Sequence, residues 1–275
     1  MNKSFSPIGV FDSGYGGLTV LNSIRKELPE YDFLYLGDNA RAPYGTRSFD
    51  VVYEYTLQCV LELFERNCDL VILACNTASA KALRTIQQGE LKNHPNKRVL
   101  GVIRPSTEIV GQFSKNKTIG IMATEGTVKS QSYRIEIQKF HPEVTVVQQA
   151  CPLWVPLIEN KAYNSKEGKK FIEKDIQRFL SQYPSVDVIV LACTHYPLLL
   201  PYLKEIIPKN IKLISQGEIV APSLKDYLKR HDWLNKKISK NGQVTYLTTE
   251  SSDLFNESVE YIFGQHVNAK NIHLK

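Results

Sequence analysis

The sequence has no hydrophobic stretch of the length that a membrane span requires. Its apolar runs, such as VILAC at residues 71–75, are far shorter than the roughly 20 residues needed to cross a bilayer. The opening residues, MNKSFSPIG, lack the apolar core of a secretory signal peptide. We therefore expect a cytoplasmic protein without a membrane partner, whose thiols stay reduced.

Cysteine is scarce, and its spacing fits neither a disulfide framework nor a zinc site. The chain has 5 cysteines, an odd number, with no CxxC pair and no Cys/His spacing typical of zinc ligands. Each cysteine is therefore either a small buried side chain or a reactive thiol.

Positive charge is present without being concentrated. Lys and Arg number 34 against 28 Asp and Glu, but the densest basic runs, such as Lys169-Lys170 and Lys229-Arg230, are short. Binding to nucleic acid favours a basic stretch interleaved with aromatic residues. We therefore expect no nucleic-acid partner, and the excess charge indicates a solvated basic surface.

The sequence does contain a regular alternation of short apolar runs with longer amphipathic ones. Leu18, Leu21, Ile24 and Leu28 follow helical spacing, and residues 48–66 form another such stretch. Alternating strands and helices predict an α/β fold in which helices cover both faces of mostly parallel sheets. The expected strands are residues 8–11, 33–36, 70–74, 99–103, 118–122, 144–147, 186–192, 211–214 and 244–247.

Two motifs occur twice along the chain. VILACNT (71–77) is echoed by IVLACTH (189–195), and IGVFDS (8–13) by IGIMAT (119–124). The repetition predicts two similar α/β units. We expect one unit to comprise residues 1–98 with 210–275 and the other residues 99–209, with the loop-like stretch 87–97 at the crossing between them.

Polar residues follow the apolar runs at the points where the expected strands end. Ligands of open parallel sheets bind beyond the carboxyl ends of the strands, so these residues mark the expected site. Cys75 and Cys193 stand out because each follows a Leu-Ala pair and opens an expected helix, whose N-terminus favours a thiolate. The alternative is that both cysteines are merely buried apolar side chains.

Asp12 and His195 are the candidate partners of these thiols, since a carboxylate or an imidazole can take the proton of a thiol. Asp12 could instead cap the helix that begins near Gly16, and His195 could be an ordinary histidine at a helix start. The glycine-rich FDSGYGG loop has neither a dinucleotide nor a P-loop pattern, but its backbone N–H groups suit an anion such as a carboxylate.

Six motifs, in order along the chain, resemble those of the bacterial glutamate racemases in the aspartate/glutamate racemase superfamily. The matches run from residue 8 to about residue 200, and the pairing of ACNTA with ACTHYP is the most specific of them. The motifs are FDSGYGG, GDNARAPYG, ACNTASA, ATEGT, CPLWVPLIEN and LACTHYPLL.

The resemblance implies two α/β domains that face each other across a central cleft, each with one catalytic cysteine, and no cofactor or metal. By resemblance, Cys75 acts on D-glutamate and Cys193 on L-glutamate, assisted by Asp12, Glu159 and His195, with Asp38 as a further acid. It also implies a homodimer and a role in supplying D-glutamate for peptidoglycan. The positions that would hold the substrate are Asp12, Ser13, Pro43, Tyr44, Gly45, Asn76, Thr77, Thr124, Thr127, Thr194 and His195.

Three other functions stay open at this stage. The same chemistry could act on aspartate, a single-cysteine hydrolase could use His195 as its base, and a two-domain binding protein could use the cleft without catalysis. The sequence departs from the resembled pattern at Tyr15, Arg104 and Gln216. Arg104 and Gln216 follow expected strands, where they could affect regulation or side-chain specificity.

Overall fold

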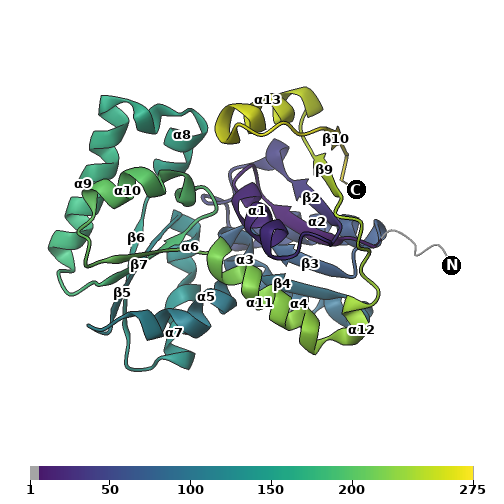
Figure 1. Cartoon of the computed structure of the whole chain (residues 1–275), viewed down its shortest axis with the longest axis horizontal. Coiled ribbons are helices and arrows are strands. Elements are labelled where there is room, and N and C mark those ends of the chain that lie inside the picture. The colour runs from purple at the N-terminus through teal and green to yellow at the C-terminus, as the bar shows by residue number, and fades with distance from the viewer. Residues whose placement is uncertain (1–5, 275) are drawn as a thin grey trace.

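The computed structural model describes residues 6–274 and has two lobes, each built on its own parallel sheet (Figure 1). The first sheet has six strands in the order β10-β9-β2-β1-β3-β4, and every neighbouring pair is parallel. Its strands are β1 (Ile8–Asp12), β2 (Phe33–Gly37), β3 (Leu70–Leu73), β4 (Arg98–Gly101), β9 (Val244–Thr248) and β10 (Ala269–Asn271).

The second sheet has four parallel strands in the order β6-β5-β7-β8. Its strands are β5 (Thr118–Ala123), β6 (Thr145–Ala150), β7 (Val188–Ala192) and β8 (Lys212–Ser215). This order matches β2-β1-β3-β4 of the first sheet, with β5 in the place of β1 and β7 in the place of β3. The predicted pair of similar parallel units is therefore confirmed, and the two cysteine motifs follow equivalent strands.

The expected boundaries between the units are wrong at both crossings. The strand at 98–101 was expected in the second unit, but it pairs with β3 in the first sheet. The strand at 212–215 was expected in the first unit, but it pairs with β7 in the second sheet. The polar stretch 87–97 is a connection within the first lobe. The chain passes to the second lobe only after β4, because β4 pairs with β3 and completes that edge of the first sheet. Residues 1–5 and 275 of the expected first unit lie outside the described residues.

Helices cover both faces of each sheet, as the continuous apolar strands require. Two apolar clusters flank the first sheet and two flank the second. The first lobe carries α1 (Gly17–Glu27), α2 (Phe49–Glu65), α3 (Asn76–Lys81), α4 (Leu83–Gln88), α11 (Gly217–Arg230), α12 (Asp232–Asn235) and α13 (Ser252–Phe263). The second carries α5 (Ile103–Val110), α6 (Glu125–Ser130), α7 (Ser132–Phe140), α8 (Trp154–Glu159), α9 (Lys166–Gln182) and α10 (Leu200–Ile206).

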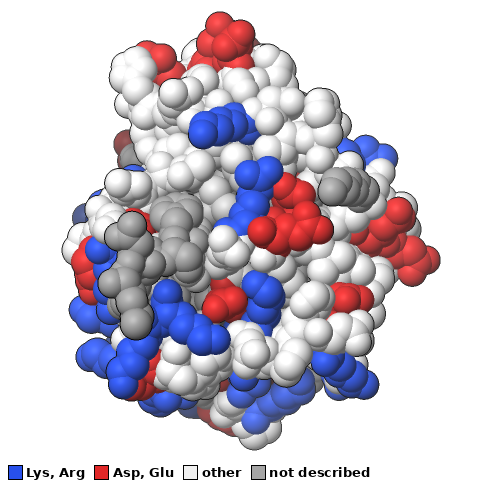
Figure 2. Space-filling view, turned by 90° about the vertical axis from the view of Figure 1, so that its right-hand side faces the viewer, with Lys and Arg blue, Asp and Glu red and all other residues white. Residues whose placement is uncertain are grey.

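Short 3₁₀ turns complete the connections between these elements. They are η1 (Asn39–Arg41), η2 (Glu90–Asn93), η3 (Gly111–Phe113), η4 (Ala162–Asn164) and η5 (Tyr196–Leu199). Within residues 6–274, no helix has the length and apolarity of a membrane span. On the face of the first lobe shown in Figure 2, Lys and Arg side chains are spread with Asp and Glu among them, as the scattered charges of the sequence predict.

Candidate active site

A cavity of about 460 Å³ lies between the two lobes at the carboxyl ends of their strands. Both Cys75 and Cys193 line it, and each cysteine is only 5–6% exposed. The other predicted residues that line the cavity are Ser13, Pro43, Tyr44, Gly45, Asn76, Thr77, Thr124, Glu159, Thr194 and His195. Three predicted residues, Asp12, Asp38 and Thr127, lie behind this lining.

Cys75 caps helix α3, as its position after β3 predicts. Its sulfur accepts a hydrogen bond from the backbone N–H of Ala78 at 3.4 Å and lies 3.3 Å from the hydroxyl of Ser13. Burial, and to a smaller extent the nearby Asp12, raise the pKa of Cys75 to about 12, against the lowering effect of the hydrogen bonds with Ser13 and Ala78. Burial thus outweighs the expected help from the helix N-terminus, and the Cys75 thiol keeps its proton at neutral pH.

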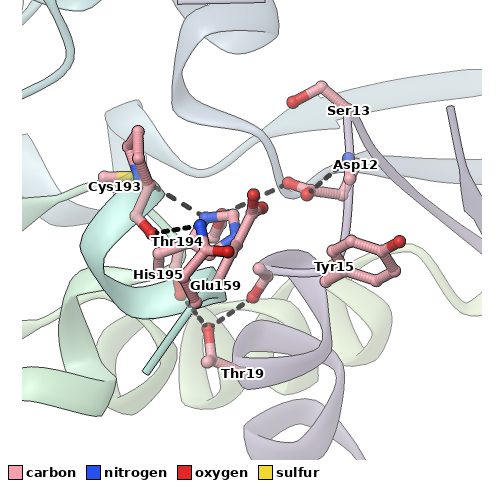
Figure 3. Close-up of polar contacts among 12 residues, drawn as sticks. Asp12, Ser13, Tyr15, Thr19, Glu159, Cys193, Thr194 and His195 are labelled. Atoms are coloured by element: carbon pink, nitrogen blue, oxygen red, sulfur yellow. Dashed lines mark hydrogen bonds and ion pairs between the residues drawn. The ribbon is translucent and has the colours of Figure 1, made fainter. Parts of the chain in front are cut away.

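Cys193 lies in a different environment from that of Cys75. It is followed by the 3₁₀ turn η5 rather than by an α-helix. Its sulfur lies 4.0 Å from Nδ1 of His195, whose Nε2 is 2.9 Å from the carboxylate of Glu159 on α8 (Figure 3). Burial acts to lower the pKa of His195, but the contacts with Cys193 and Glu159 outweigh it and raise the pKa to about 10. The imidazole is therefore a cation at neutral pH.

Asp12 connects the glycine loop of the first lobe to the second lobe. Its carboxylate is 1% exposed and accepts hydrogen bonds from the N–H of Gly14 at 3.1 Å and from the hydroxyl of Thr194 at 3.4 Å. Burial raises the pKa of Asp12, while the nearby His195 and these hydrogen bonds lower it. Asp12 therefore lies beside Thr194 and His195, but it does not line the cavity.

The glycines of the FDSGYGG loop allow a close approach between the lobes. A Cβ on Gly16 would lie 2.4 Å from both Nδ1 of His195 and Oγ1 of Thr194, and one on Gly17 would lie 2.4 Å from Cβ of Asp12. Such distances are far inside van der Waals contact. This close packing against Thr194, His195 and Asp12, rather than a phosphate site, accounts for the paired glycines.

A cluster of three hydroxyls joins α3 to α6. Thr77 Oγ1 lies 3.0 Å from Thr124 Oγ1 and 3.4 Å from Thr127 Oγ1, and the last two are 3.1 Å apart. Thr77 and Thr124 line the cavity, while Thr127 is fully buried behind them. Thr127 therefore supports the other two hydroxyls and does not face a ligand itself.

Asn76 lines the cavity, but its side-chain amide is bonded within the protein. It donates to Gln216 at 2.5 Å, Gln216 donates to the hydroxyl of Tyr133 at 2.5 Å, and Tyr133 donates back to Asn76 at 2.7 Å. Gln216 also donates to the backbone carbonyl of Val102, at the first crossing between the lobes, at 3.2 Å. The ring joins α3 to the second lobe and gives Gln216 a structural role at both crossings.

Asp38 does not reach the cavity, in contrast to the prediction from the resemblance. Its fully buried carboxylate accepts hydrogen bonds from Arg41 at 2.7 Å, from Thr249 at 2.8 Å and from the hydroxyl of Tyr44. These bonds fix the loop that carries Pro43, which lines the cavity. Asp38 thus acts on the site through the loop that it holds.

The residues of one wall of the cavity were not predicted from the sequence, although the helical spacing from Glu159 could have indicated one of them. Pro152, Val155 and Pro156 line the site beside Glu159, and Val155 lies one turn before Glu159 on α8. Tyr15 also lines the cavity, and its hydroxyl donates to Glu250 at 2.6 Å.

Arg104 lies at a separate cavity of about 350 Å³ between α4, α5 and α11, away from the two thiols. Among residues 6–274, no group of three His, Cys, Asp or Glu side chains is arranged to hold a metal ion.

The sequence and the fold both match proteins of known activity. The family described as Asp/Glu/Hydantoin racemase matches residues 8–223. The chain is 36% identical over 261 residues to glutamate racemase 2 of Caldanaerobacter subterraneus subsp. tengcongensis, covering 95% of this chain and 94% of that protein. It is 36% identical over 270 residues to a glutamate racemase of Streptococcus agalactiae, covering 97% of this chain and 98% of that protein.

Solved structures give the same result. A glutamate racemase isoform from Bacillus anthracis superposes with a TM-score of 0.85 at 30% identity, covering 98% of both chains. A Francisella tularensis glutamate racemase in complex with D-glutamate gives 0.82 at 27% identity, covering 98% of this chain and 97% of that one. An aspartate racemase from Picrophilus torridus shares only the fold, with a TM-score of 0.53 at 16% identity over 82% of this chain and 95% of that one. These similarities confirm the resemblance seen in the motifs, and the chain belongs to the Asp/Glu/Hydantoin racemase family of isomerases.

Proposed function

We propose that this protein interconverts L- and D-glutamate, with Cys75 and Cys193 as its two bases. The observation that supports this most directly is that both sulfurs line one cavity, each from the equivalent strand end of a different lobe. Reversing the configuration of a carbon requires a proton to leave one face and another to arrive at the opposite face. Two thiols contributed by different lobes can meet that requirement, whereas a hydrolase with one cysteine has no use for the second.

Each turnover exchanges the roles of the two thiols. One sulfur, as thiolate, takes the α-proton, and the electron pair left behind spreads onto the substrate carboxylate. The other thiol then gives its proton to the opposite face and becomes the thiolate. Burial keeps the proton on Cys75, while the cationic His195 lies close enough to exchange a proton with Cys193. By the family resemblance, Cys75 acts on the D-isomer and Cys193 on the L-isomer.

Neutral donors suit the negative charge that develops on the substrate. The hydroxyls of Ser13, Thr77 and Thr124 line the cavity, and such donors stabilise an anionic transition state without protonating the thiolate. The loop of residues 43–45 supplies further backbone groups. These residues are the proposed contacts of the substrate's carboxylates and ammonium group.

Glutamate is the proposed substrate because the relatives and structures described above that match the chain at 27–36% identity are glutamate racemases. Aspartate is one methylene shorter, and an apolar pocket separates such substrates by only about 1–3 kcal/mol. We further propose that the D-glutamate serves peptidoglycan synthesis in the cytoplasm. The homodimer implied by the resemblance also stays a prediction.

The test is racemisation by the purified protein without added pyridoxal cofactor, followed by circular dichroism and by deuterium incorporation in D₂O. We expect deuterium at the α-carbon of the product. Cys75→Ser and Cys193→Ser should each reduce turnover by at least about 1,000-fold.

Cys68→Ser is the matched control for these two variants, because Cys68 is buried in the core of the first lobe. It should keep its activity. Near-normal racemisation by Cys75→Ser would exclude the two-base reaction and favour the hydrolase, and no turnover by the wild type would favour a binding protein. Faster turnover of aspartate than of glutamate would reassign the substrate.

A further inference from the structure

The side chain of Thr19, in the first turn of α1, reaches from the first lobe to the catalytic segment of the second. Its hydroxyl lies 2.8 Å from the main-chain oxygen of Thr194 and 2.9 Å from that of Gly16, and both contacts are drawn in Figure 3. The Gly16 contact is local to the helix. The Thr194 contact joins residues 175 positions apart in different lobes.

The Thr194 carbonyl is well placed to orient the residues on either side of it. It belongs to the peptide unit between Thr194 and His195, so a bond to this oxygen limits rotation of that unit. Rotation there would move the imidazole, whose Nδ1 lies 4.0 Å from Cys193 and whose Nε2 lies 2.9 Å from Glu159. The Thr194 side chain is held in turn by Asp12.

Helix α1 gives this contact a rigid base. It packs closely against α11, where a Cβ on Gly217 would lie 2.3 Å from Oγ of Ser23. At its other end, Gly16 packs so closely against the second lobe that a Cβ there would lie 2.4 Å from Nδ1 of His195. The hydroxyl of Thr19 therefore projects from an element that is fixed on both sides.

We infer that Thr19 is a positioning residue that sets the Cys193–His195 segment against the first lobe and so keeps the second thiol aligned with Cys75. The inference rests on the proposed two-thiol reaction for its consequence in catalysis. It assigns Thr19 no contact with substrate. The hydroxyl acts through the main chain of Thr194. If Thr19 had a structural role alone, its loss would lower the stability of the protein without changing the proton transfer at Cys75 or at Cys193.

The test compares Thr19→Val, which keeps the shape and loses the hydroxyl, with Thr19→Ser, which keeps the hydroxyl. We expect kcat/KM to fall about 10-fold in Thr19→Val, the effect of leaving one buried acceptor unpaired, and to be restored in Thr19→Ser. Thr56→Val is the matched control, because Thr56 is buried and its hydroxyl has no hydrogen-bond partner among the described residues. It should keep the wild-type rate.

Isotope effects separate positioning from stability. With α-deuterated L- and D-glutamate, Thr19→Val should raise the primary isotope effect for the enantiomer deprotonated by Cys193 and lower it for the other, because the Cys193 step becomes slower. A lower melting temperature with unchanged kcat and isotope effects would overturn the inference.

A second readout does not depend on racemase activity. Alkylation by iodoacetamide, mapped by peptide mass, should become faster at Cys193 relative to Cys75 in Thr19→Val and not in Thr19→Ser. An unchanged ratio would reject the positioning role. Absence of racemisation in the wild type would reject the proposed function alone and leave this ratio as the test of Thr19.

Discussion

The two lobes place one cysteine each at the same point of the same topology, yet they surround the two thiols differently. Cys75 caps an α-helix, accepts a hydrogen bond from the N–H of Ala78 and lies 3.3 Å from the neutral hydroxyl of Ser13. Cys193 precedes a 3₁₀ turn and lies beside the ion pair of His195 with Glu159. Equivalent backbone positions have thus received different chemical partners.

The difference shows how one fold can prepare two like groups for unlike roles. The proposed racemisation requires one thiol to hold a proton while the other is ready to receive one. Burial raises the pKa of Cys75 to about 12, so its proton is retained near neutral pH. A charged imidazole lies next to the other thiol. The resting site is therefore asymmetric although its scaffold is repeated.

Among the neighbours of the two thiols, His195 is expected to have the largest effect when its imidazole is removed. His195→Gln should lower kcat by about 100-fold, the size of a typical contribution from an acid–base group, because the Cys193 side loses its proton partner. Steady-state racemisation measures this directly. His231→Gln is the matched control, since that imidazole bonds a carbonyl far from the cavity. An equal loss of kcat in His195→Gln and His231→Gln would show that the imidazole beside Cys193 has no special role. The different surroundings of Cys75 and Cys193 would then have no functional meaning.

A smaller effect is expected from Glu159→Gln, which keeps the shape of the pair and removes its charge. Glu159 is 34% exposed on its side chain, so we expect a fall in kcat of about 10-fold. The variant also tests the pH dependence of stability. In the wild type the pKa of His195 is raised from 6.5 to about 10. The charged pair therefore stabilises the fold fully below pH 6.5, and this contribution is lost as pH rises toward 10.

Urea unfolding of both proteins across this pH range provides the measurement. The difference in free energy of unfolding between the wild type and Glu159→Gln should shrink as pH rises. A difference that is constant with pH would show that the imidazole is not held in its charged form by Glu159.

The smallest effect is expected on the Cys75 side. Ser13→Ala removes one neutral hydrogen bond at 3.3 Å, so we expect kcat to fall about threefold. Because the Ser13 bond lowers the pKa of Cys75 against the larger effect of burial, the variant should also need a higher pH for alkylation of this thiol. The pH profile of Cys75 modification measures the shift. A loss as large as that of His195→Gln would mean that the two thiols depend equally on their neighbours.

Much of this site could be predicted because it lies at strand ends. Apolar runs fixed the positions of most strands, and the residues after β1, β3, β5 and β7 converge at one cavity for the reason that parallel strands end at one edge. Asp38, which the resemblance implied as a further acid of the site, shows where this rule fails. It also follows a strand, but its carboxylate turns to Arg41 and Thr249, and only the packing of β9 beside β2 brings Thr249 there.

The sequence by itself determined the α/β class, the repeated unit and the pair of thiols, since these follow from local periodicity and from motifs of a few residues. The tertiary structure alone decided which strands complete each sheet, which acids face the cavity and which groups surround each thiol. Those properties depend on burial and on contacts such as Thr19 with Thr194 and Asn76 with Gln216. Such partners lie far apart along the chain and meet only when the lobes pack together.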